Sequence, residues 1–80
     1  MSTLTVHFEP LAVDVTVTPS VLHVVLADGR EVSAALAWFP RLSAASDAQR
    51  RNWKLIGRGI GIYWPDLDED ISVESLLSVR

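Results

Sequence analysis

The sequence predicts a small α+β fold, with one mostly antiparallel sheet of about five to six short strands and two short helices. Apolar and polar residues alternate with a period of two through the first half of the chain, which is typical of strands. Two serines in the second half begin patterns that start helices, and glycines and prolines separate the runs. Eighty residues, of which 49% are apolar, suit a single domain spanning residues 1–80.

Two alternating runs open the chain. In Thr3–Phe8 every second residue is apolar, and Pro10 then interrupts the pattern. The next run turns Ala12, Asp14 and Thr16 outward if its larger apolar residues face the core. That predicted inward set is Leu11, Val13, Val15 and Val17. We therefore predict two N-terminal strands separated at Pro10.

The third run, Val21–Leu26, is apolar on both faces, which is typical of a central strand whose two sides are covered and is compatible with a homodimer. The following Asp28-Gly29 pair favours a tight hairpin turn, because both residue types tolerate positive φ. A fourth, antiparallel strand is therefore expected, ended by Pro40, which lacks an amide donor. Its predicted inward set is Val32, Ala34, Leu36 and Trp38.

The second half predicts two helices and a further strand. Ser46 and Gln49 have the spacing of a capping box, so a short helix is expected to begin there and to end by Asn52. Ser72 is the predicted cap of a terminal helix that continues through Val79. Between the helices, Ile60–Trp64 alternates as a strand stopped by Pro65, and three glycines predict a tight turn or bulge between two strands. These glycines are Gly57, Gly59 and Gly61.

The residues do not form a recognisable catalytic, cofactor or metal site, so we predict a protein that is not an enzyme. The chain has no cysteine, which removes thiolate ligands and a cysteine nucleophile. Carboxylates at 66, 68 and 70 match the start of a calcium loop, but Ile71 stands where glycine is needed and Leu77 where glutamate is needed. His7 and His23 are interpreted as surface or edge-strand side chains.

Charge is unevenly distributed along the chain, although the net charge is only −3. Five of the ten acidic residues fall within nine positions, and we call them the acidic segment: Asp66, Asp68, Glu69, Asp70 and Glu74. Clustered anions steer a cationic partner during encounter, so the segment is the candidate site for a basic protein. The alternative reading, which stays open, is a solvated loop leading into the last helix.

The three tryptophans are expected to build the core, with one of them available as an interface anchor; Trp64, next to the acidic segment, is the candidate. The basic stretch at 50–58 is a second candidate site. Its cations beside Trp53 could grip a nucleic-acid backbone, although the acidic net charge opposes this. These cations are Arg50, Arg51, Lys54 and Arg58.

The expected location is the cytoplasm, without a membrane partner. No apolar run approaches the ~18 residues needed to cross a bilayer. The N-terminus MSTLTVHFEP has neither the cationic start nor the continuous apolar stretch of a signal peptide.

Several blocks of the chain are similar to one protein family. They are W-F-P-R-L from Trp38, S-D-A-Q-R-R-N-W from Ser46 and G-I-Y-W-P-D-L-D-E-D-I-S-V-E-S-L-L from Gly61. With the Asp28-Gly29 turn, they resemble the bacterial family called domain of unknown function 2442 over roughly residues 20–78. The resemblance implies a small α+β protein with no established activity. It also implies genes that often lie on mobile or defence-associated loci beside another small protein, from which an antitoxin-like role has been suggested.

The predicted function is therefore a non-catalytic, antitoxin-like interaction module that presents the acidic segment to a basic protein partner, such as a toxin or a nucleic-acid-binding effector. The first alternative is a phage or mobile-element inhibitor, such as an anti-CRISPR protein, that acts as an acidic DNA mimic on a CRISPR effector. The second alternative is direct nucleic-acid binding through residues 50–58.

Overall fold

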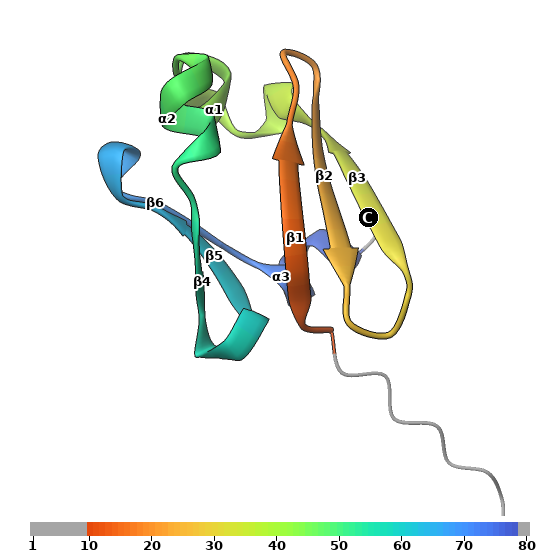
Figure 1. Cartoon of the computed structure of the whole chain (residues 1–80). Helices are drawn as coiled ribbons and strands as arrows, with labels where there is room; N and C mark the ends of the chain where they lie inside the picture. The colour runs from red at the N-terminus through yellow and green to blue at the C-terminus, as the bar shows by residue number, and fades with distance from the viewer. Residues whose placement is uncertain (1–9, 79–80) are drawn as a thin grey trace, which may run out of the picture.

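The described part of the chain, residues 10–78 of a computed structural model, contains two antiparallel sheets of three strands each (Figure 1). Sheet A has the order β1 (Ala12–Val17), β2 (Val21–Leu26), β3 (Glu31–Ala35). Sheet B has the order β4 (Lys54–Ile56), β5 (Gly61–Trp64), β6 (Glu69–Ser72). The predicted α+β class and strand number are confirmed, but the strands divide into two sheets. The predicted strand Thr3–Phe8 lies outside the described residues.

Three short α-helices accompany the sheets: α1 (Pro40–Ser43), α2 (Asp47–Arg51) and α3 (Val73–Leu77). The capping box of α2 is confirmed, because the Gln49 amide donates to Ser46 Oγ at 3.1 Å and the Ser46 amide donates to Gln49 Oε1 at 2.9 Å. Ser72 caps α3 by accepting from the Ser75 amide at 3.1 Å. Helix α1 was not predicted.

The end of the predicted fourth strand differs from the prediction. β3 stops at Ala35, and Leu36–Trp38 form a 3-10 turn closed by the Phe39 amide on Leu36 O at 2.9 Å. Pro40 then occupies the first position of α1, where its fixed φ suits a helix and its missing amide costs nothing. The sequence predicts only the end of a strand at Pro40, and the start of a helix there is a correction. Because the chain has already turned, Trp38 is 72% exposed and does not face the core.

A β-bulge reverses the alternation at the start of β1. Ala12 pairs with Leu26 and Asp14 with Val25, so Val13 is the extra residue. The bulge buries Ala12 and leaves Val13 53% exposed, the opposite of the predicted pattern. After the bulge Val15 faces inward as predicted. β2 is the central strand of sheet A, also as predicted.

In sheet B, a 3-10 turn over Gly57–Gly59 joins β4 to β5, which confirms the glycine turn. β5 begins at Gly61, and Ile60 is 59% exposed instead of inward-facing. Both sheets contribute to one core. Its largest fully buried side chains are Trp64, Leu22, Leu26, Leu36, Leu42, Ile62, Val24 and Val73.

The two sheets touch through backbone at Gly59. A Cβ built on Gly59 would lie 2.4 Å from Ala12 O and 2.9 Å from Ala12 N, and the φ of Gly59 is +106°. Glycine is therefore needed for two reasons, its left-handed backbone and the missing side chain. The contact places the β4–β5 turn against the bulged end of β1.

Arg50 connects both helices of the middle segment and is only 8% exposed. Its Nε donates to Leu42 O at 3.0 Å and its Nη2 to Ser43 O at 2.9 Å, so it satisfies carbonyls at the end of α1. Nη1 lies 3.4 Å from Asp47 Oδ1. The carbonyl of Arg50 in turn accepts from Trp64 Nε1 at 3.1 Å, which ties α2 to β5.

Replacing Gly59 tests the contact between the sheets. We expect Gly59→Ala to lower the free energy of unfolding by about 2–5 kcal/mol, because backbone strain and a clash with Ala12 add together. Gly29→Ala is the matched control, since Gly29 has φ +94° but no atom within 4 Å of an added Cβ. Urea denaturation measures both variants. Equal losses would show that backbone strain alone accounts for the effect.

Replacing Arg50 tests the helix connection. We expect Arg50→Ala to lower the free energy of unfolding by about 2–4 kcal/mol, because it leaves the Leu42 and Ser43 carbonyls without their donors. The side chain of the neighbouring Arg51 is exposed and makes no hydrogen bond to the described residues. Arg51→Ala should change stability by less than about 0.5 kcal/mol. Thermal unfolding of the Arg50→Ala and Arg51→Ala variants measures the difference. Equal losses of stability in the two variants would contradict the role given to Arg50.

Candidate functional site

The acidic segment runs along a turn, a strand and a helix. Asp66 lies in the 3-10 turn Pro65–Leu67, and Asp68 follows with φ +50°, a left-handed conformation that Asp tolerates. This turn returns the chain so that Glu69 pairs with Trp64 in a β6–β5 ladder. The segment was predicted either as a partner site or as a loop entering the last helix. It contains a strand, which that loop interpretation did not include.

Arg41 holds the turn of the acidic segment to α1. Its Nη1 donates to Asp68 O at 3.0 Å and to Leu67 O at 3.2 Å, and lies 4.0 Å from Glu69 Oε1. The Glu69 side chain is 25% exposed. Glu69 is thus partly compensated by a cation of its own chain.

The remaining anions of the segment keep their charge largely uncompensated. Asp66 accepts a hydrogen bond from Asn52 Nδ2 at 3.1 Å. Within residues 10–78, the carboxylates of Asp66, Asp68, Asp70 and Glu74 form no ion pair within 4.0 Å. Asp68, Asp70 and Glu74 are exposed. Asp66 is exposed as well, so four exposed carboxylates lack a cationic partner, and the side chains of three of them also lack a hydrogen bond within the described residues.

Trp64 does not belong to this surface, which corrects its assignment as a partner-binding residue. The side chain is fully buried, and its Nε1 is engaged by the Arg50 carbonyl. A residue that alternates inward on β5 beside Ile62 and Ile71 builds the core instead. Trp53 is partly buried against the same core. The expectation that tryptophans build the core is met by these two and fails for Trp38.

Trp38 is the aromatic residue that sequence reasoning missed as a surface group. It lines a depression of about 510 Å³ together with Phe39 and with Leu76 of α3. Small polar side chains complete the walls: Ser33, Ser75 and Ser78. The signal that could have located it is the W-F-P order, because a proline that starts a helix turns the preceding residues out of the strand.

The depression and the acidic segment are neighbours. Arg41, three residues after Trp38, contacts the turn at Leu67 and Asp68. At the other end of the segment, α3 begins directly after β6 and forms part of the Trp38 depression. The Trp38 depression is therefore connected to both ends of the acidic segment, through Arg41 and through α3, although no carboxylate lines it. Asp70 lines a separate hollow with Ile56 and Ile60.

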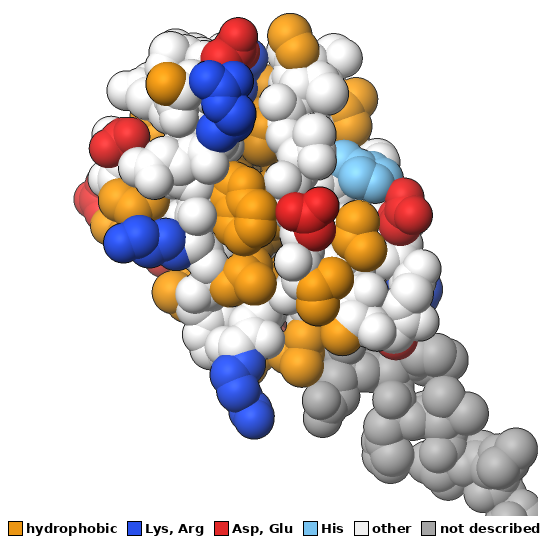
Figure 2. Space-filling model, viewed as in Figure 1, with side chains coloured by type: hydrophobic (Ala, Val, Ile, Leu, Met, Phe, Trp, Pro, Cys, Tyr) orange, Lys and Arg blue, Asp and Glu red, His pale blue; other side chains and the backbone are white. Residues whose placement is uncertain are grey.

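The basic stretch does not form a single cationic patch. Arg50 uses its guanidinium on carbonyls of its own chain. Arg51, Lys54 and Arg58 are exposed, but they lie before, in and after β4, so they follow the length of that strand. Figure 2 shows the cations of this face in separate groups.

Outside the acidic segment, His23 and Asp28 each form local pairs. His23 lies 2.8 Å from Ser33 Oγ through Nδ1 and 2.8 Å from Glu31 Oε1 through Nε2, linking β2 to β3. Hydrogen bonds from Arg30 lower the pKa of Asp28 in the β2–β3 turn. His7 lies outside the described residues. Between residues 10 and 78, no group of three or more His, Asp or Glu side chains is arranged to hold a metal ion.

None of the helices in the described region has the length and apolar character required to traverse a membrane.

The comparisons with known proteins identify the chain at the level of a family. A search of curated proteins and a search of solved structures found no match. The family described as "Protein of unknown function (DUF2442)" matches residues 12–79. The match spans both sheets, the three helices, Trp38 and the whole acidic segment. The chain belongs to the DUF2442 family.

Proposed function

We propose that this protein is a non-catalytic, antitoxin-like module that binds a basic protein through the Trp38 depression and the acidic segment. The observation that carries the proposal is the 72% exposure of Trp38 beside Phe39 and Leu76, in a depression that Arg41 and α3 connect to the acidic segment. Tryptophan is costly to leave in water and is among the commonest anchors of protein interfaces.

The two parts of this surface have different roles. The indole supplies contact area at low entropic cost, because only two torsions are fixed on binding. The carboxylates of Asp68, Asp70 and Glu74 attract a cationic surface during encounter and fix its orientation. An aromatic anchor joined to a separate acidic segment therefore fits a partner that has an apolar pocket and, beside that pocket, a Lys- and Arg-rich surface.

The same surface supports the alternative of an anti-CRISPR inhibitor that mimics nucleic acid, because both roles present carboxylates to a basic protein. The partner distinguishes them: an inhibitor competes with DNA for a CRISPR effector, and a toxin-binding module does not. Direct nucleic-acid binding through residues 50–58 has less support, since Arg50 is engaged internally and the other cations are spread along β4.

The surface is tested with two variants of opposite physical effect. The immobilised chain is used to isolate a partner from native cells, and its affinity is measured by calorimetry with the purified pair. We expect Trp38→Ala to weaken binding by about 30-fold or more, corresponding to about 2 kcal/mol for a buried anchor. Because Trp38 is exposed, the free energy of unfolding should change by less than about 1 kcal/mol.

The triple variant Asp68→Asn, Asp70→Asn, Glu74→Gln should mainly reduce the association rate and its dependence on salt. Asp14→Asn is the control, because Asp14 is an exposed anion of β1 outside this surface. Unchanged affinity in both the Trp38 variant and the triple variant would refute the proposed surface. Loss of partner binding in the presence of DNA would favour the inhibitor.

A further inference from the structure

The outer edge of β1 presents unpaired backbone groups. The Thr18 amide donates to Val21 O on β2 at 2.9 Å, so the amides of Val17 and Val15, at alternate positions, face away from β2. Among residues 10–78, no other strand pairs with this side of β1. Within residues 10–78, the N–H and C=O groups of Val15 and Val17 on this edge have no hydrogen-bond partner.

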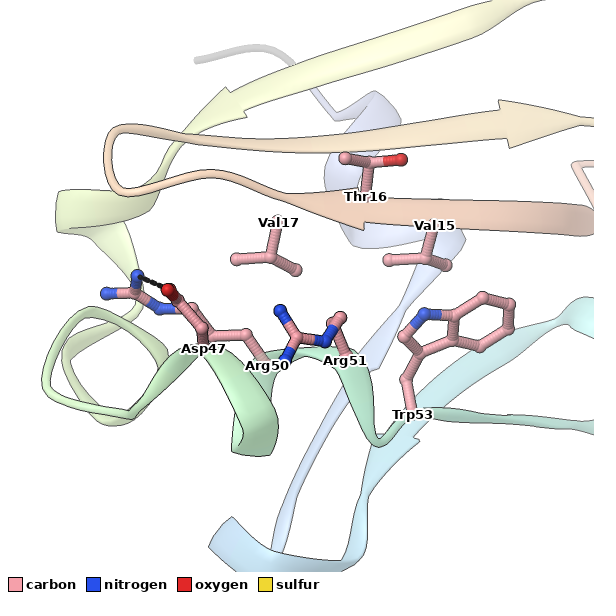
Figure 3. Close-up of a pocket in the computed structure, with 7 residues that line it drawn as sticks. All are labelled: Val15, Thr16, Val17, Asp47, Arg50, Arg51 and Trp53. Carbon is pink, nitrogen blue, oxygen red and sulfur yellow. Dashed lines mark hydrogen bonds and ion pairs between the residues drawn. The ribbon is translucent and has the colours of Figure 1, made fainter.

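These groups border a groove between β1 and the segment that contains α2 and Trp53 (Figure 3). The groove has a volume of about 510 Å³. Figure 3 shows the Arg51 guanidinium in the gap below Val17 and the Trp53 ring below Val15. Arg50 and Asp47, which also line the groove, form an ion pair with each other. The Arg51 side chain has no hydrogen-bond or ion-pair partner among the described residues. The groove therefore combines free strand edge, one apolar wall and one uncompensated cation.

The part of the β1 edge that can pair with another strand is short, because the fold covers the N-terminal end of β1. The Gly59 turn lies against the N and O atoms of Ala12, and the bulge at Val13 follows. Val15–Val17 remain, which is about 10 Å of strand. This length matches a short extended segment, and two residues of edge offer up to four backbone hydrogen bonds.

We propose that this groove binds an extended peptide segment of a partner protein, which adds as a strand to β1 and places a carboxylate on Arg51. The proposal is separate from the Trp38 surface and goes beyond the function proposed above. Charge complementarity favours an acidic side chain, because Arg51 is exposed and a guanidinium binds a carboxylate through two parallel hydrogen bonds. An apolar side chain of the same segment packs on Trp53.

The other occupants fit this groove less well. A second copy pairing through β1 would bring two like grooves together, each with its own Arg51 cation. A nucleic-acid backbone needs several cations along its length, and the groove supplies one that is unpaired. Amides at every second residue instead match the carbonyl spacing of another strand.

The probe is a capped peptide in which valine and threonine alternate around one central glutamate. Titration into ¹⁵N-labelled protein should move the amide signals of Val15 and Val17 and the indole signal of Trp53. Two further probes carry N-methyl groups, one on both valines and one on the threonines that flank the glutamate. Since alternate residues of a strand face opposite sides, one methylated probe should lose at least about tenfold in affinity and the other should bind.

The role of Arg51 is tested with a matched pair of cations. Arg51→Gln should weaken the peptide by about three- to fivefold, as expected for an exposed ion pair. Lys54→Gln is the control, because Lys54 is an exposed cation that does not line the groove. A probe with glutamine for glutamate should bind the native protein less tightly by the same factor, and Arg51→Gln should then have no further effect.

Several results would overturn the proposal. The first is equal binding of the two methylated probes. The second is the absence of any signal change up to about 1 mM peptide, a concentration at the weak end of specific affinities. The third is movement of the Val15 and Val17 signals by an oligonucleotide but not by the peptide. Trp38→Ala should leave peptide binding unchanged. This comparison separates a failure of the groove from a failure of the proposed function.

Discussion

The buried guanidinium of Arg50 is the interaction on which the arrangement of this protein depends. Helices of four and five residues are too short to be stable alone, because the free-energy cost of helix nucleation exceeds the gain from the hydrogen bonds of a single turn. Arg50 provides donors for the open carbonyls of α1, while its own carbonyl accepts from Trp64. The middle segment is thereby attached to sheet B. The attachment also sets the positions of Arg41 and Trp38, which lie on either side of Pro40.

Local signals in the sequence predicted the elements that local interactions determine. The Ser46–Gln49 capping box, the Ser72 cap and the glycine turn between β4 and β5 all involve residues within a few positions of each other. The physics of these features is contained in a short stretch of chain, so one sequence is sufficient to recognise them.

Features that depend on distant contacts were missed. The bulge at Val13 arises where β1 meets the Gly59 turn, about 46 positions later in the chain. The exposure of Trp38 depends on the turn into α1, whose carbonyls are satisfied by Arg50. Hydrophobic alternation alone predicts that the side chains of Val13 and Trp38 face the core. The acidic residues are adjacent in sequence, but only the fold shows that Arg41 lies beside Glu69. Only the fold shows, too, that Trp38 is exposed and Trp64 is buried.

The bulge of β1 and the turn that covers it also bear on how the protein avoids self-association. An uncovered strand edge is a template for another chain, and repeated pairing of such edges leads to fibrils. Here the extra residue at Val13 interrupts the regular spacing of donors and acceptors, and Gly59 occupies the adjoining backbone. The interval left open is too short to nucleate an extended ladder between copies. The part of the β1 edge that residues 10–78 leave open is therefore a poor seed for aggregation.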